Sequence, residues 1–421
     1  MAEDHSVSNP SRGWRLIHTR DFGLLWWGQT TSQIGEGLNK VALLWFVYNL
    51  TGSVMKMTMV GLLQTIPPLV FGPLIGVYLD RLPKKAVMVW VDVLRALLTF
   101  LIPALYAMDL LSIEGLYGLI FLTSVVSTVF GPALVSAVPL LVRPSELMSA
   151  NALVQGTNNI GMLLGPAISG IMIALINAEN VLFVNSATFL ISALCLLPIR
   201  FTKPHVRATE SSSSIWEELK VGFHFVFGQQ SMVFTLVIIS SLYNLGVSAF
   251  VFILPVYAKE FLQVGPVQLG WLWSALGVGM LAASTWLAWK KHSDIKGRLR
   301  IVVSGMTIGG LAVCSLSLLD TPLVAAGIVI IVGGSTAVLN PIVWALLQEV
   351  TPEHLIGRVL TTFSVGSMAS AMAGMTGFGW VADTIGPAAS LVGLGLVLLL
   401  TAAVAVACAR RACPIPVAHA G

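Results

Sequence analysis

Apolar runs about as long as a membrane is thick recur along this chain, and they limit the folds that it can adopt. A helix needs ~20 mostly apolar residues to cross ~30 Å of hydrocarbon. Because lipid offers no partner to a backbone amide or carbonyl, spanning segments of this length must be helical. The sequence therefore predicts an all-α membrane protein with twelve transmembrane helices, near residues 22–49, 57–78, 86–107, 116–141, 152–176, 181–199, 231–257, 267–289, 301–319, 322–347, 359–381 and 387–408.

The composition agrees with a lipid environment and excludes a soluble globular domain. Hydrophobic residues make up 56% of the chain and charged residues only 10%, whereas a soluble domain carries about 25% charged residues. The net charge of +4 comes from scattered basic residues, which do not form the aromatic-interleaved basic patch of a nucleic-acid-binding protein. We expect a lipid bilayer, and no nucleic acid, as the surroundings of this protein.

The sequence predicts neither enzymatic chemistry nor a cofactor. Cys195, Cys314 and Cys408 fall inside apolar runs and Cys413 lies in the tail, so their spacing suits neither a metal site nor a disulfide framework. No phosphate-binding Gly-x-x-x-x-Gly-Lys-Ser/Thr segment occurs. The first apolar run is also too long for the core of a signal peptide, so we expect it to remain as a span.

The distribution of Lys and Arg predicts how the chain is oriented. Basic residues near span ends are retained on the cytoplasmic side. With a cytoplasmic N-terminus, most of the 23 basic residues fall in inner loops, and only Lys56 and Lys259 lie in outer ones. We expect a multi-pass protein of the plasma (inner) membrane with both termini in the cytoplasm.

A polar stretch at the middle of the chain predicts two halves of six spans each. It begins at Arg200 (RFTKPHVRATESSSSIWEE), and a short repeat supports the division, because Pro132 and Pro144 recur half a chain later as Pro341 and Pro352. Two similar proline turns arising by chance are the alternative. Parallel six-span repeats are typical of transporters with one site between the halves. The predicted segments are a cytoplasmic N-terminal segment (1–21), the N-terminal half (22–200), a cytoplasmic linker with an amphipathic segment (201–230), the C-terminal half (231–408) and a cytoplasmic tail (409–421).

The loop after the second span carries a family resemblance. Gly76, Asp80, Arg81, Lys84 and Lys85 stand at the spacing of Gly-x-x-x-Asp-Arg-x-Gly-Arg-Arg, which resembles the signature loop of the major facilitator superfamily, with Pro83 in place of a glycine. The resemblance implies that Asp80 belongs to a cytoplasmic gate. Asp92 and Arg95 are one turn apart near the cytoplasmic end of span three, so we expect them to extend this gate, with binding of the solute as their alternative role. The alternative is that the basic residues only set topology and that Asp80 caps a helix.

Span five contains a second motif of the same superfamily. Gly161, Gly165, Pro166 and Gly170 resemble the Gly-x-x-x-Gly-Pro-x-x-Gly-Gly pattern of antiporters, with Ser169 in place of one glycine. Small residues four apart also let helices approach closely, so a simple packing motif is the alternative. Nearly the whole chain looks like the branch that contains macrolide-efflux and enterobactin-exporter proteins.

Charges inside the spans predict where the transport site lies. Gln29, Gln33, Glu36 and Lys40 advance by four, three and four residues, so they share one face of span one and should face a central cavity. Glu36 is the candidate proton carrier, because an intramembrane acid marks ion or proton pathways. Lys40, one turn away, would favour its ionised form, and a permanent Glu36–Lys40 ion pair is the alternative.

Uncharged polar residues in other spans could complete the cavity. We expect about half of them to contact solute and the rest to pack helices; they are Gln64, Asn158, Asn159, Asn185, Tyr243, Asn244 and Asn340.

The predicted function is secondary active export by alternating access. The expected solute is an amphipathic organic molecule, such as a drug or secondary metabolite, exchanged for protons by a monomer; multidrug resistance would follow. A siderophore or lysolipid transporter of the same fold is one alternative. A non-transporting receptor or assembly factor is another, although a static bundle gains little from four buried charges.

Overall fold

The computed structural model describes residues 15–79, 82–143, 146–201, 231–289, 295–352 and 355–411, and these ranges contain helices and no strands. The predicted linker therefore lies outside the described residues, as do most of both terminal segments. The helices are η1 (Leu16–His18), α2 (Arg20–Thr51), α3 (Val54–Leu79), α4 (Lys84–Ala107), α5 (Ile113–Ala137), η2 (Val138–Leu140), α6 (Leu147–Ile176), α7 (Ala178–Leu196), α9 (Ser231–Val256), η4 (Tyr257–Phe261), α10 (Pro266–Trp289), α11 (Ile295–Leu316), α12 (Pro322–Ala337), α13 (Leu339–Val350), α14 (Ile356–Thr384) and α15 (Pro387–Arg411).

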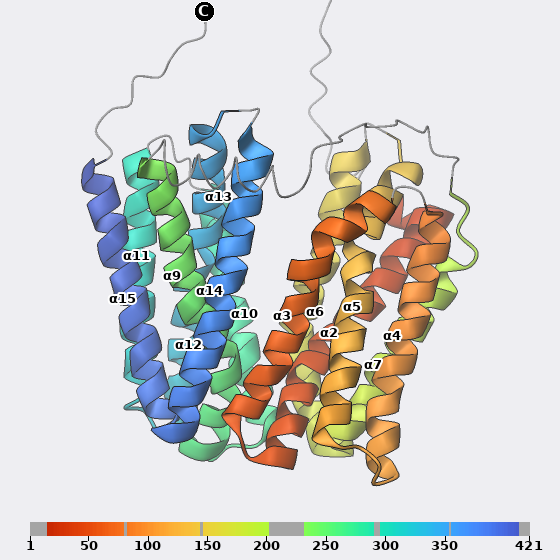
Figure 1. Ribbon diagram of the computed structural model, residues 1–421, viewed down its shortest axis with the longest axis horizontal. Coiled ribbons are helices and arrows are strands. Elements are labelled where there is room, and N and C mark those ends of the chain that lie inside the picture. The colour runs from red at the N-terminus through yellow and green to blue at the C-terminus, as the bar shows by residue number, and fades with distance from the viewer. Residues whose placement is uncertain are drawn as a thin grey trace, which may run out of the picture. The chain divides into compact units, whose positions relative to one another are not determined.

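The described helices provide the twelve spans that the apolar runs predicted (Figure 1). Ten spans are long and apolar enough to cross a membrane, and one of them, Pro322–Val350, joins α12 to α13. The other two are α2 and α14, which are 32 and 29 residues long. They are less apolar because α2 carries Glu36 and Lys40 and α14 is rich in Gly, Ser and Thr.

Local sequence explains where several helices begin and end. The hydroxyl of Ser112 accepts a hydrogen bond of 3.0 Å from the amide of Gly115, which caps α5. Asn177 separates α6 from α7 at φ 65°, a conformation that Asn tolerates better than most residues. The break between α12 and α13 falls at Val338, just before Pro341, whose ring cannot fit against the carbonyl four residues earlier.

The chain divides into two compact units. Unit 1 comprises Met1–Phe46 and Leu63–Glu210, and unit 2 comprises Val47–Leu62 and Ser211–Gly421. In unit 1, α4 packs on α7 and α5; in unit 2, the helices at the same positions of the second half pack alike, α11 on α15 and α12. This correspondence is the internal pseudo-symmetry that the proline repeat predicted.

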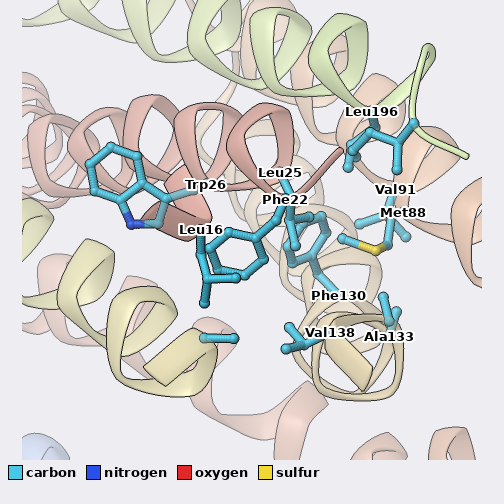
Figure 2. Packing of buried hydrophobic residues seen from close by; sticks show 13 residues of the cluster. Leu16, Phe22, Leu25, Trp26, Met88, Val91, Phe130, Ala133, Val138 and Leu196 are labelled. Carbon is cyan, nitrogen blue, oxygen red and sulfur yellow. The ribbon is translucent and has the colours of Figure 1, made fainter. Parts of the chain in front are cut away.

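A cluster of buried apolar side chains packs helices of unit 1 together (Figure 2). Phe22 and Leu25 of α2 are fully buried against Met88 of α4 and Phe130 of α5. Nearby, the indole nitrogen of Trp26 donates to the carbonyl of Leu153 over 3.1 Å, which joins α2 to α6. The cluster packs α2 against α4 and α5, the helices that also contribute polar residues to the pocket of this unit.

Candidate solute and proton site

Unit 1 contains a pocket of about 350 Å³ among its helices. This volume is in the range of small-molecule sites, ~300 to 1,000 Å³. Charged residues, hydroxyls and apolar side chains all contribute to its wall: Glu36, Asn39, Lys40, Leu43, Gln64, Pro68, Arg95, Thr99, Ile102, Ile120, Thr123, Ser124, Ser127, Thr128 and Phe189.

Three charged side chains form a line from the pocket into the protein. Arg95 of α4 makes an ion pair with Glu36 of α2 and a second one, of 3.3 Å, with Asp92 on its own helix. The exposed fractions of these side chains are 42% for Glu36, 4% for Arg95 and 0% for Asp92. Glu36 is therefore the accessible carboxylate of this group, and Asp92 is the buried one.

Two aromatic rings pack against the guanidinium group of Arg95. Its central carbon lies 4.0 Å from the ring centroid of Phe189 and 5.4 Å from that of Phe130. Such cation–π contacts stabilise a desolvated cation. Neither Nε of Arg95 nor Oδ2 of Asp92 has a hydrogen-bond partner within the part of the chain that the structure describes. The group is held in place while retaining unused hydrogen-bonding capacity.

Arg95 lines this pocket, although its place in the sequence predicts a part in the cytoplasmic gate with Asp80, which lies outside the described residues. Arg95 lies near the middle of α4, where the helix passes α2, and its partner on α2 is Glu36. Lys40 lines the same pocket one turn further along α2. The sequence pattern showed the i, i+4 relation of Glu36 to Lys40 but gave no sign of the contact with α4, because that contact depends on how the helices pack.

One face of α5 supplies a row of hydroxyl groups that sequence reasoning missed. Thr123 donates its hydroxyl proton to Leu119, Ser124 to Gln64 and Thr128 to Ser124, each to a carbonyl oxygen 2.8 to 2.9 Å away. With their protons used in this way, these oxygens can only accept further hydrogen bonds. The i, i+4 spacing of Thr123 to Ser127 and of Ser124 to Thr128 is the signal that could have revealed this face.

The small residues of span five pack α6 against α2. A Cβ atom added to Gly165 would stand 2.5 Å from the Cα of Gly37, and one added to Gly161 would collide with the backbone of Gln33. Ser169 is fully buried and donates a hydrogen bond of 2.8 Å to the carbonyl of Leu38. The serine therefore adds an interhelical hydrogen bond where the pattern has glycine, and the close approach holds the Glu36 segment of α2 in place. Pro166 and Gly170, the other residues of this motif, are also buried.

The other residues predicted to line the cavity have different surroundings in the structure. Of these uncharged residues, Gln64 lines the described pocket. Asn185 is buried and accepts from Thr188, Tyr243 donates to the carbonyl of Thr336, and Asn244 donates to Ser240 on its own helix. Of these three contacts, that of Tyr243 joins α9 to α12, and the other two lie within single helices. Asn158, Asn159 and Asn340 are exposed, and Gln29 is buried.

The predicted gate loop is described only in part. Gly76 lies in α3, whereas Asp80 and Arg81 are outside the described residues. Lys84 begins α4. The ammonium group of Lys85 donates to the carbonyls of Leu197 and Ile199, 2.5 and 2.9 Å away, where α7 ends. Cations favour the carbonyl end of a helix, so Lys85 ties the start of α4 to the end of α7.

Comparison with known proteins connects this architecture to membrane transport. A sequence model of the Major Facilitator Superfamily matches residues 25–375. Macrolide efflux protein A of Streptococcus pyogenes is 24% identical over 360 residues, which cover 85% of this chain and 87% of that protein. The multidrug efflux pump Tap of Mycolicibacterium fortuitum is 26% identical over 398 residues, covering 91% and 94%.

Solved structures share the fold at lower identity. A bacterial homologue of the iron transporter ferroportin superposes with a TM-score of 0.72 at 15% identity, covering 93% of this chain and 99% of that one. The nucleoside transporter NupG gives a TM-score of 0.71 at 14% identity, covering 93% and 98%. These similarities concern the fold alone.

Proposed function

Since the chain belongs to the Major Facilitator Superfamily, as its signature loop predicted, we propose that it is a proton-coupled exporter of amphipathic organic solutes. The protein is a multi-pass membrane transporter and not an enzyme. The relatives named for macrolide and multidrug efflux support export as the direction of transport. We further propose that it works as a monomer in the plasma membrane with both termini in the cytoplasm.

The observation that carries the proposal is the pair of carboxylates around one guanidinium. Exchange of solute for a proton requires a carboxylate that can be neutralised without leaving a buried cation uncompensated. Glu36 meets this requirement, because Arg95 keeps Asp92 as a partner when Glu36 is protonated or binds a solute. Breaking a buried pair outright would cost ~3 to 5 kcal/mol. Asp92 removes most of that cost from the transport cycle.

The wall of the pocket favours a solute that carries hydrogen-bond donors. Glu36 offers a carboxylate and the α5 hydroxyls offer acceptor oxygens, while Leu43, Ile102 and Ile120 provide apolar surface. A protonated amine on an apolar body would satisfy both parts. Such a solute and a proton would compete for Glu36, which is the exchange that antiport requires.

Transport by purified protein in proteoliposomes tests this function. A panel of cationic dyes and antibiotics is offered under an imposed pH gradient, and both solute movement and proton release are followed. Wild-type protein should accumulate solute against its gradient. Glu36→Gln should lose pH-driven accumulation while still exchanging solute down its own gradient, and Glu114→Gln, which changes an acid outside the pocket, should behave as wild type.

Two outcomes would contradict the proposal in different ways. Transport by the wild type without any proton release would remove proton coupling but leave the pocket as a solute site. Wild-type accumulation by Glu36→Gln would show that this carboxylate carries no proton.

A further inference from the structure

A second cavity lies in unit 2, and it shares no lining residue with the pocket of unit 1. It is a groove of about 310 Å³ between α11 and α15, lined by Lys296, Arg300, Val303, Ser304, Val406 and Ala409. Lys296, Arg300 and Ser304 are four residues apart, so they share one face of α11. No acidic residue lines this groove among the residues that the structure describes.

The groove lies where both of its helices meet the membrane surface. The span of α11 begins at Ile295, and the span of α15 ends at Ala409. Lys296 and Arg300 are thus in the first two turns of their span, at the depth of lipid headgroups. Val303 and Val406 lie about one turn deeper, beside the acyl chains. The basic groups match the charged headgroup of a phospholipid, and the apolar cleft beneath them matches its acyl chains.

The basic residues of α11 are not equivalent. Arg298 makes an ion pair of 2.7 Å with Glu349 of α13, so its charge is used within the protein. Lys296 and Arg300 line the groove, and Arg298 does not. A cation in the first turns of a helix is unfavourable with respect to the helix dipole, so helix stability does not explain their place. The orientation of the chain in the membrane requires positive charge near the end of the span, but it does not require a groove beside that charge.

We propose that this groove binds the phosphate headgroup of an anionic phospholipid from the surrounding bilayer. Lys296 and Arg300 contact the phosphate, as basic pockets between transmembrane helices do for anionic headgroups. The hydroxyl of Ser304 donates to the carbonyl of Ile301, 3.0 Å away, so it adds no donor to the phosphate. The acyl chains follow Val303 and Val406. This inference does not depend on the transported solute or on proton coupling.

Native mass spectrometry of the purified full-length protein tests the site. The protein in detergent is titrated with phosphatidylglycerol, with phosphatidylcholine or with inorganic phosphate, and the bound molecules are counted. Wild type should retain phosphatidylglycerol in preference to the other two. Lys296→Gln and Arg300→Gln should each weaken its binding about fivefold, the factor that corresponds to ~1 kcal/mol for a basic residue near a membrane surface.

A control variant on the same helix distinguishes lipid binding in the groove from a general effect of positive charge at that depth. Arg298→Gln removes one positive charge at nearly the same depth but outside the groove, and it should leave phosphatidylglycerol binding unchanged. Ala409→Trp fills the groove without changing charge and should weaken binding. Thermal unfolding of each variant verifies its fold. An equal loss in Arg298→Gln, no loss in Ala409→Trp, or equal binding of phosphatidylcholine or free phosphate would overturn the proposal.

Discussion

At the scale of single residues, the two carboxylates beside Arg95 differ in burial, and this difference separates their roles. Asp92 is fully buried and lies 3.3 Å from the guanidinium, whereas Glu36 is partly exposed to the pocket. Removing a partner from a buried ion pair destabilises a protein strongly, while removing an exposed partner has a small effect. Asp92 is therefore expected to hold the arginine in place, and Glu36 to act in exchange.

We predict that Asp92→Asn lowers the stability of the protein more than Glu36→Gln does. The loss should approach ~3 kcal/mol for Asp92→Asn, since the remaining charge of Arg95 would have only the exposed Glu36 as its partner. Thermal unfolding in detergent, followed by tryptophan fluorescence, measures the difference. The opposite order of melting temperatures would refute the division of roles.

A second prediction at this scale concerns the contact of α6 with α2. Gly165→Leu should disrupt the approach of Gly165 to Gly37 and destabilise the protein by ~1 to 3 kcal/mol, the usual cost of overpacking. Ser169→Ala keeps the volume nearly constant and loses only the hydrogen bond to Leu38, so it should cost ~0.6 kcal/mol. Both values follow from thermal unfolding. Equal, small effects would mean that the close packing is not needed for stability.

At the scale of elements, the start of α3 is capped by a residue from the end of α14. Both belong to unit 2, because Val47–Leu62 is part of that unit. The carboxylate of Asp383 accepts hydrogen bonds from the amides of Val54 and Met55, at 2.6 and 3.0 Å, and from the hydroxyl of Ser53 at 2.7 Å. An acidic group at a helix N-terminus satisfies free amides and interacts favourably with the helix dipole.

Replacing this cap should loosen the beginning of α3. Asp383→Asn removes the charge and keeps the shape, so we expect a loss of ~1 kcal/mol, within the range for caps. Hydrogen exchange at the amides of Val54 and Met55 should become faster in the variant. Exchange at Gly115, whose amide is bonded to Ser112, serves as the internal control. Unchanged exchange at Val54 and Met55 would contradict the cap.

At the scale of the whole molecule, the distribution of basic residues predicts the orientation in the membrane. In a variant without Cys195, Cys314, Cys408 and Cys413, single cysteines at positions 56 and 259 should react with an impermeant maleimide added to intact spheroplasts. A cysteine at position 207, in the linker, should react only after the membrane is opened. Labelling at 207 alone in intact cells would reverse the orientation.

The sequence by itself determined the features that depend on local pattern. The length and spacing of its apolar runs specified twelve helical spans, because a bilayer of fixed thickness leaves few alternatives. The loop around Gly76 and Lys85 identified the superfamily. The i, i+4 spacing also predicted that Glu36 and Lys40 share one face of span one, and both residues line the pocket of unit 1.

Only the tertiary structure decided which side chains from different helices meet. Arg95 contacts Glu36, and Ser169 contacts Leu38, because packing fixes the rotation and depth of α4 and α6 against α2. Periodicity gives the face on which a residue lies but not the helix that it faces. For the same reason the sequence predicts Arg95 near the gate but not its contacts, whereas the packed helices place it between a buried and an accessible carboxylate in the wall of the pocket.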